Sequence, residues 1–247
     1  GRFVIGGARE TLGAIAAGVE VVGAFVCPAT SDSEEARAAV TALSEMGADV
    51  ATVADEVFEK LCFGAGRDGI VAVARTPRRS LADVQVPPEG VVAVLEGIEK
   101  PGNVGAVLRS ADGAGVDAVI VADGGTDLFN PNTIRASLGA VFKPNVCTAT
   151  AAETLDWLRR LGLPMFAARP AATTSYAAAD YRRGAALLLG SEAAGLSDLW
   201  TDPAVTPIAL PMYGVADSLN VSATAAVLFY EARRQRDSGA PLPGEPA

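Results

Sequence analysis

Three short segments of this sequence place polar side chains and glycines directly after apolar runs. The residues are Asn103 and Arg109 in the first segment, Gly190, Glu192 and Gly195 in the second, and Ser218 and Asn220 in the third. Open α/β sheets bind ligands at the carboxyl ends of their strands, where such residues would gather. An amide and a guanidinium suit a phosphate, and glycine lets a ligand approach the backbone. Spacing alone leaves simpler interpretations open, namely a capped helix with a solvated arginine and an ordinary strand-to-helix turn.

Several kinds of catalytic site are excluded by what the sequence lacks. It has no histidine, which removes Ser-His-Asp and Cys-His nucleophiles and most catalytic zinc sites. Cys27, Cys62 and Cys147 are far apart, so we expect three reduced thiols, no disulfide and no metal site. The run from Gly64 to Gly69 fits the G-x-G-x-x-G dinucleotide pattern, but an apolar strand follows it where the pattern needs a helix. We interpret it as a loop, which disfavours a nicotinamide-dependent oxidoreductase.

Charge and hydropathy bear on the partners and the compartment. The net charge is −9, whereas proteins that bind nucleic acid without specificity usually carry a basic excess. Arginine makes up 17 of the 20 basic residues and suits bidentate phosphate contacts, so a local basic surface stays open. No apolar run approaches the roughly 20 residues that cross a bilayer, and no secretory signal opens the chain. We therefore expect a cytoplasmic protein without a membrane partner.

The elements that must position these residues follow an α/β pattern. Apolar runs predict strands at 91–95, 118–122, 164–168, 185–190 and 205–210. Helical periodicity predicts helices near 103–114, 131–141, 151–161 and 217–236. Continuous apolar strands that alternate with helices indicate a parallel sheet covered on both faces.

The chain divides into four parts by composition. Residues 1–76 predict a small α/β domain, with helices at 8–17, 33–46 and 55–61 and strands at 21–26, 50–53 and 70–75. Ser33 is a plausible N-cap of the second helix. Residues 77–90 are proline-rich and predict a linker, 91–236 form the larger α/β domain, and 237–247 read as a flexible tail.

Taken in order, these segments resemble the three motifs of the SpoU (TrmH-like) RNA ribose 2′-O-methyltransferases of the SPOUT superfamily. Asn103 and Arg109 match the first motif, Gly190, Glu192, Gly195 and Leu196 the second, and Leu210-Pro211-Met212 with Ser218 to Ser222 the third. Arg135-Ala136-Ser137 is similar to a further family segment, and the likeness covers about 91–236. Lys100 departs from the pattern, because the family usually has an aspartate there.

The resemblance implies a fold, a cofactor and partners. The fold would be a SPOUT-type parallel sheet with a C-terminal trefoil knot, preceded by a small L30e-like RNA-binding domain whose opening resembles residues 6–10. The cofactor would be S-adenosyl-L-methionine, held by Leu189, Gly190, Leu210, Met212 and Leu219, with no metal. The family acts as a homodimer on structured RNA, either ribosomal or transfer RNA.

The resemblance also implies roles for the site residues. Arg109 would bind the neighbouring RNA phosphate and stabilise the 2′-alkoxide that develops, while phosphate or water takes the proton. Asn103, Ser218 and Asn220 would position the ribose, and Glu192 would orient the site. Arg9 and Arg135 would contact RNA. The alternative is an RNA-binding module of the same fold that has lost catalysis.

Overall fold

The computed structural model describes residues 1–62 and 68–237. Most of the loop expected at 64–69, and all but the first residue of the tail expected at 237–247, lie outside the described residues. The chain divides into two compact units. The first contains Gly1–Arg79, Lys100–Arg109 and Thr126–Val146, and the second contains Ser80–Glu99, Ser110–Gly125 and Cys147–Ala247.

The first unit holds a mixed four-stranded sheet of order β1-β4-β2-β3. Its strands are β1 (Arg2–Gly6), β2 (Val21–Val26), β3 (Asp49–Thr52) and β4 (Ile70–Arg75), and its helices are α1 (Ala8–Ala16), α2 (Glu34–Glu45) and α3 (Asp55–Leu61). Strand β4 runs antiparallel to both β1 and β2, while β2 and β3 are parallel. Ser33 caps α2 as expected, because its side chain accepts a hydrogen bond from the Ala36 amide at 3.0 Å.

The second sheet has six strands in the order β10-β8-β9-β5-β6-β7. The strands are β5 (Val91–Glu96), β6 (Ala118–Ala122), β7 (Val146–Ala149), β8 (Met165–Ala168), β9 (Ala185–Leu189) and β10 (Val205–Ile208). The neighbours from β10 through β8, β9 and β5 to β6 pair in parallel. Strands β5, β6 and β9 are buried at every position, which confirms the parallel sheet expected from their continuous apolar runs.

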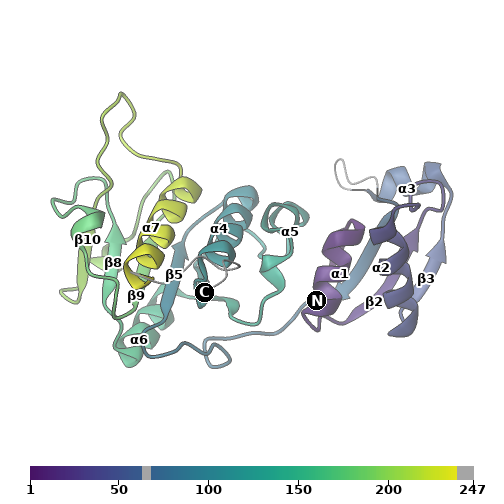
Figure 1. Cartoon of the computed structure of the whole chain (residues 1–247), viewed down its shortest axis with the longest axis horizontal. Helices are drawn as coiled ribbons and strands as arrows, with labels where there is room; N and C mark the ends of the chain where they lie inside the picture. Colours follow the sequence, from purple (N-terminus) through teal and green to yellow (C-terminus); the bar gives the residue numbers. More distant parts are fainter. Residues whose placement is uncertain (63–67, 238–247) are drawn as a thin grey trace, which may run out of the picture. The chain divides into compact units, whose positions relative to one another are not determined.

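Four α-helices of the described residues follow β5 along the chain, and side-chain caps set where three of them begin. They are α4 (Pro101–Ala114), α5 (Pro131–Ser137), α6 (Ala151–Leu161) and α7 (Val221–Arg236), all labelled in Figure 1. Helix α7 packs against β9, and α6 packs against β6. Thr150 and Glu153 form a capping box at the start of α6. The helix expected at 131–141 ends at Ser137, because Leu138 adopts the left-handed conformation. The helix expected at 217–236 begins only at Val221, because Asn220 is its N-cap.

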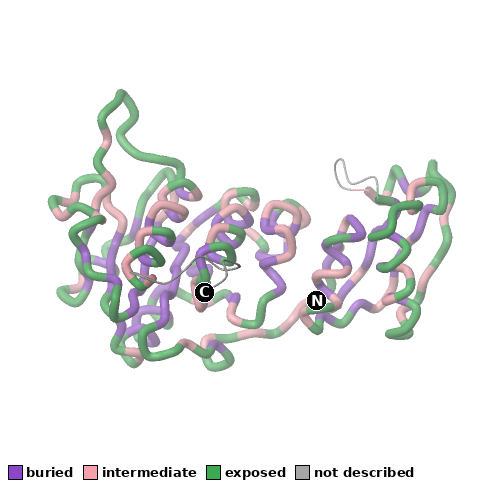
Figure 2. The backbone as a smooth tube through the Cα atoms, viewed as in Figure 1, coloured by how far each residue is buried: buried purple, intermediate pink, exposed green. Residues whose placement is uncertain are grey.

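The core of the second unit is built from the inward faces of the parallel strands (Figure 2). Val92 and Val94 of β5, Ile120 of β6 and Leu188 of β9 have no exposed surface, and Trp200 is 1% exposed. Trp200 belongs to the short 3₁₀ helix η3 (Asp198–Thr201). The core therefore fixes both the strands and the segment that follows the second motif.

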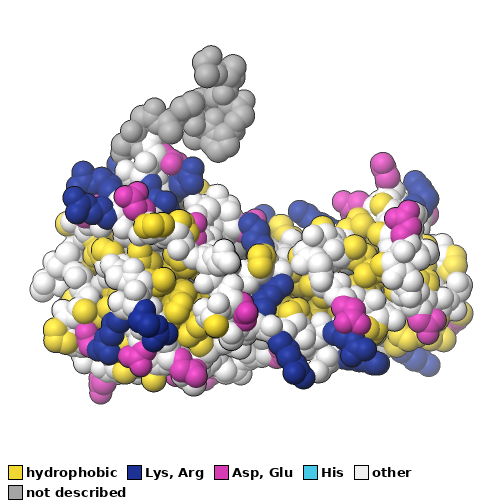
Figure 3. All heavy atoms as spheres, turned by 90° about the horizontal axis from the view of Figure 1, so that it is seen from below, with side chains coloured by type: hydrophobic (Ala, Val, Ile, Leu, Met, Phe, Trp, Pro, Cys, Tyr) yellow, Lys and Arg dark blue, Asp and Glu magenta, His cyan; other side chains and the backbone are white. Residues whose placement is uncertain are grey.

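Several arginines of the second unit form ion pairs with surface carboxylates. Arg182 binds Asp180 through two hydrogen bonds of 2.8 Å, which lower the pKa of that carboxyl from 3.8 to about 2. Arg234 binds Glu231 in the same way and lowers the pKa of Glu231. Figure 3 shows basic and acidic side chains interspersed on the face it displays.

Candidate active site

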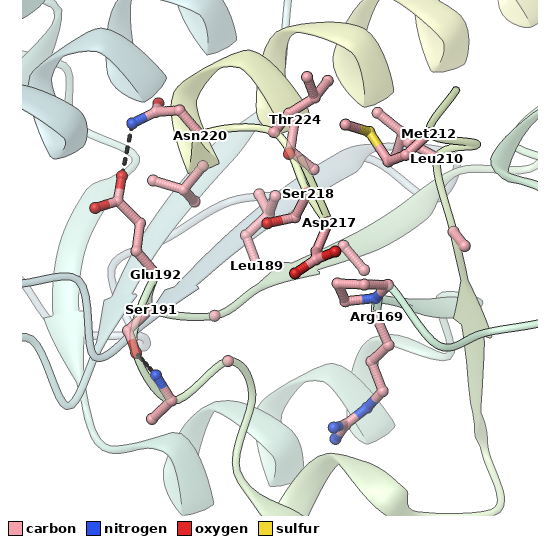
Figure 4. Close-up of a pocket in the computed structure, with 18 of the residues that line it drawn as sticks. Arg169, Leu189, Ser191, Glu192, Leu210, Met212, Asp217, Ser218, Asn220 and Thr224 are labelled. Atoms are coloured by element: carbon pink, nitrogen blue, oxygen red, sulfur yellow. Dashed lines mark hydrogen bonds between the residues drawn. The ribbon is translucent and has the colours of Figure 1, made fainter. Parts of the chain in front are cut away.

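The carboxyl ends of β8, β9 and β10 surround a cavity of about 540 Å³ in the second unit (Figure 4). Because these strands are parallel neighbours, the segments that follow them meet at the same edge of the sheet. The lining comes from residues 168–170, 189–195, 208–210, 212, 217–221 and 224. The cavity thus draws together the second and third motifs, which are about 20 residues apart in the sequence.

Gly190 is required where β9 passes into its loop. A Cβ atom at this position would lie 2.1 Å from the carbonyl carbon of Gly195, far closer than any side chain tolerates. The loop then folds back on itself, since Ser191 and Gly195 exchange backbone hydrogen bonds of 3.2 and 2.9 Å. Gly195 has a φ of +68°, which glycine adopts without strain. The two glycines of the motif therefore allow a tight loop that brings Glu192 to the cavity.

Apolar side chains form much of the cavity wall. Leu189 ends β9, Ile208 ends β10, and Leu210, Met212 and Leu219 come from the segment after β10. Leu219 is 40% exposed, so part of this wall faces outward. The sequence analysis assigned five residues to cofactor binding. All five line this cavity, namely Leu189, Gly190, Leu210, Met212 and Leu219.

Polar groups from two loops meet at the rim. The Asn220 side-chain amide donates to Glu192 Oε1 at 2.6 Å, and its oxygen accepts from the amide and the hydroxyl of Ser222 at 2.8 and 2.6 Å. Asn220 therefore caps α7 and holds the Glu192 carboxylate with one side chain. Ser218 lines the cavity beside Asp217 (Figure 4). Three of the five expected catalytic residues are thus brought together.

The other two expected catalytic residues belong to α4 and to the first unit. Asn103 is half-buried near the start of this helix, and Arg109 is exposed two turns later. A Cβ atom at Gly105 would lie 2.6 Å from the Ala136 side chain and from the Thr133 carbonyl oxygen, so α4 and α5 pack closely there. The small residues beside Arg135 permit this contact. Arg9 lies exposed on α1.

The structure adds residues that the sequence motifs did not single out. Asp217 and Arg169 line the cavity, and Glu96, at the end of β5, accepts hydrogen bonds from the amide and hydroxyl of Ser197 at 2.8 and 2.7 Å. A polar residue at the end of a buried strand is the signal that Glu96 offered. Arg169 directly follows strand β8, which is the same signal. For Asp217, the only signal in the sequence is that it precedes Ser218.

Residues 90–230 match the family model described as the SpoU rRNA Methylase family. The chain belongs to this family. SpoU relatives include "23S rRNA (uridine(2479)-2'-O)-methyltransferase" of Streptomyces viridochromogenes, 33% identical over 69% of this chain and 61% of the relative. Another is "23S rRNA (guanosine(2553)-2'-O)-methyltransferase RlmP" of Bacillus subtilis, 31% identical over 70% of this chain and 72% of the relative. The match thus spans less than two thirds of the Streptomyces protein.

Two solved structures resemble the SpoU chain along almost its whole length. One, described as an RNA 2'-O ribose methyltransferase, is 42% identical, with a TM-score of 0.83 over 95% of this chain and 89% of that one. The SpoU methyltransferase AviRb from Streptomyces viridochromogenes, in complex with the cofactor AdoMet, is 28% identical, with a TM-score of 0.87 over 97% and 92%. The α/β fold expected from the resemblance is therefore confirmed. The trefoil knot stays a prediction, because strand order does not specify how a chain threads.

The described parts of the SpoU chain are residues 1–62 and 68–237. No helix in these ranges is long and apolar enough to cross a membrane. These ranges also contain no cluster of three or more Cys, Asp or Glu side chains that could hold a metal ion.

Proposed function

We propose that this chain transfers a methyl group from S-adenosyl-L-methionine to a ribose 2′-hydroxyl of ribosomal RNA. One observation carries the proposal: a single cavity gathers the glycine loop at 190–195 and the segment 208–220, which are the second and third motifs of the family. Two relatives are named as 23S rRNA 2′-O-methyltransferases, which favours ribosomal over transfer RNA.

The residues present suit the cofactor. The cavity volume of about 540 Å³ lies within the roughly 300–1,000 Å³ of small-molecule sites. Leu189, Leu210 and Met212 offer apolar walls for an adenine ring, and Gly190 leaves the backbone accessible. We assign cofactor binding to these four residues and Leu219. When bound, S-adenosylmethionine supplies an electrophilic methyl carbon on a sulfonium centre.

Catalysis then consists mainly of aligning the ribose and removing its proton. Asn220, fixed by its bonds to Glu192 and Ser222, would present an oriented amide to the ribose or its phosphate, with Ser218 beside it. Glu192 would orient that amide. Asn103 would contact the phosphate from the first turn of α4.

Arg109 would bind an RNA phosphate and stabilise the developing 2′-alkoxide. An arginine stays protonated at any pH at which proteins fold, so it acts as a fixed positive charge and not as the base. The proton would pass to the neighbouring phosphate or to water. The exposure of Arg109 leaves its guanidinium accessible to a large substrate.

RNA binding and assembly complete the proposal. We assign residues 1–76 to RNA binding, 77–90 to a linker and 91–236 to catalysis. Arg9, which is exposed on α1, and Arg135 would contact the RNA.

We further propose a cytoplasmic homodimer. Tyr213 and Val215 are available for such an interface, because they are 94% and 102% exposed in the segment that also lines the cavity. Light scattering that gave a mass near 25.1 kDa at micromolar concentration would argue against the dimer.

The decisive experiment is transfer of tritiated methyl groups from S-adenosylmethionine to ribosomal RNA from a strain that lacks the gene. We expect label in ribosomal RNA, resistance of the modified linkage to alkaline hydrolysis, and one mapped nucleotide. RNA binding without cofactor binding in a calorimetric titration would instead favour the inactive RNA-binding module. Label on a base, or in transfer RNA alone, would contradict the proposed substrate.

A further inference from the structure

The loop 191–197, whose residues 191–195 line the cavity, is held at its far end by two charged side chains. Glu96 accepts hydrogen bonds from the Ser197 amide and hydroxyl at 2.8 and 2.7 Å. The Arg169 guanidinium donates to the carbonyl oxygens of Leu196 and Ser197 at 3.3 and 3.0 Å. Glu96 ends β5 and Arg169 directly follows β8, and these strands flank β9 on either side. The loop that leaves β9 is therefore tied to both neighbouring strands.

The contact with Glu96 replaces an ordinary helix cap. Ser197 stands at the N-cap position of η3, where a serine side chain usually accepts a hydrogen bond from the first turn. Here it makes no such bond, and its hydroxyl is directed to Glu96 instead. Glu96 is only 7% exposed, and a buried carboxylate is tolerated only where donors satisfy it. The pairing is therefore a specific feature of the interior.

Arg169 serves the loop and not the open cavity. The residue lines the cavity, yet Figure 4 shows its guanidinium pointing away from Asp217 and Ser218. This direction agrees with its hydrogen bonds to the Leu196 and Ser197 carbonyl oxygens. The Ser197 carbonyl also accepts from the Trp200 amide at 3.3 Å, and Trp200 is buried.

The loop has little freedom between its two fixed ends. At its start Gly190 lies against the Gly195 backbone, and inside it Ser191 and Gly195 exchange two backbone hydrogen bonds. The Ser191 hydroxyl also accepts from the Ala194 amide at 3.0 Å. A displacement of Ser197 would therefore carry the whole turn with it, including Glu192 and the cavity wall.

We propose that Glu96 and Arg169 are positioning residues that hold loop 191–197 in the shape that binds S-adenosylmethionine. This inference rests on the proposed function, and it assigns neither side chain to the chemical step. Both act through Ser197 and Leu196. Loss of either should weaken cofactor binding and leave turnover at saturating cofactor close to that of the wild type.

The test compares Glu96→Gln, Glu96→Ala, Ser197→Ala and Arg169→Met with Arg159→Met as matched control. Arg159 is also paired with a carboxylate of the second unit, Asp202, but it does not line the cavity. The readouts are the Kd for S-adenosylmethionine by calorimetry, KM for the cofactor against kcat, and amide hydrogen exchange of 191–197 without cofactor. We expect Glu96→Ala to raise Kd about 10-fold or more, because it leaves two donors unpaired, and to speed exchange in the loop.

Two comparisons separate this mechanism from general damage to the fold. Glu96→Gln keeps the shape and one acceptor, so it should raise Kd by less than Glu96→Ala, about 3-fold. The double variant Glu96→Ala/Ser197→Ala should bind no worse than Glu96→Ala alone, because Ser197→Ala removes only a hydroxyl whose acceptor is already lost in Glu96→Ala. Arg159→Met should leave Kd and loop exchange unchanged.

The outcomes distinguish the two proposals. If the wild type does not bind S-adenosylmethionine, the proposed function fails. If the wild type binds and the Ser197→Ala and Arg169→Met proteins, folded by circular dichroism, bind equally well, the positioning role is wrong and the function stands. Weaker binding with unchanged loop exchange, or a loss in kcat equal to that in kcat/KM, would also overturn the positioning role.

Discussion

At the scale of single residues, the guanidinium of Arg109 provides the sharpest test of the proposed chemistry. Arg109→Lys keeps the positive charge but removes the planar fork that can bind a phosphate and an alkoxide together. Loss of one such donor typically costs about 10²–10³ in kcat. We expect a fall of that size in single-turnover methyl transfer, with the Kd for S-adenosylmethionine unchanged.

Arg160→Lys on α6 makes a matched control, because Arg160 is also an exposed arginine on a helix. It should methylate RNA at the wild-type rate. Wild-type turnover by Arg109→Lys would show that charge alone suffices and that the guanidinium has no specific role.

The ion pair between Asp180 and Arg182 predicts how stability depends on pH. Hydrogen bonds from Arg182 lower the pKa of Asp180 from 3.8 to about 2 in the folded protein. A lowered pKa means that the stabilisation is fully present above pH 3.8 and is lost as the pH falls through about 2. Asp180→Asn should therefore have a lower Tm than the wild type at pH 6, and the difference should shrink as the pH falls through about 2 and vanish below it. Calorimetric scans across this range test it, and a gap that stays constant with pH would contradict the assignment.

At the scale of elements, the turn after β9 leaves no room for a side chain at Gly190. Gly190→Ala would place a Cβ atom 2.1 Å from the Gly195 carbonyl carbon, which belongs to the backbone and cannot rotate away. Overpacking of this kind costs about 1–3 kcal/mol, and the loop must move to relieve it. We expect a lower free energy of unfolding in urea and a loss of cofactor affinity.

The matched control for that substitution is Gly13→Ala within α1. Nothing lies within 4 Å of a Cβ atom there, and alanine favours the helix by up to about 1 kcal/mol. Gly13→Ala should therefore be neutral or stabilising. If both variants matched the wild type in urea, the backbone contact between Gly190 and Gly195 would not constrain the turn.

The elements also show which parts of the fold can be predicted from sequence. Strands β5, β6 and β9 were predicted because burial on both faces requires apolar residues at every position. Strand β7, with the sequence VCTA, was missed because four residues with a polar member give no such run. The end of α5 was missed because Leu138 adopts a left-handed conformation that its residue type does not favour.

The candidate site also has a part that the sequence could predict and a part that it could not. Motif residues that follow apolar strands could be found, because the parallel arrangement places strand ends together. Glu96 and Ser197 are 101 residues apart, and their pairing depends on β5 lying next to β9. A contact of this kind follows from strand order, which local sequence patterns do not specify.

At the scale of the whole molecule, a net charge of −9 must be reconciled with an RNA substrate. Binding then has to come from a few arginines that contact phosphate, because the summed charge repels RNA. Arg9 is exposed on α1 in the domain to which we assign RNA binding. Arg9→Ala should weaken RNA binding about equally for all sequences and reduce the slope of log Kd against log salt by about one.

Filter binding of the RNA target at several salt concentrations measures this slope, with Arg37→Ala as control. Arg37 is an exposed arginine in the same unit, but its guanidinium is already engaged with the Asp32 carbonyl oxygen. Its loss should leave the slope unchanged. Equal slopes for the wild type and Arg9→Ala would remove Arg9 from the phosphate contacts. An affinity that did not depend on salt in any variant would mean that phosphate contacts do not govern binding, and that an acidic protein recognises its RNA through bases and shape instead.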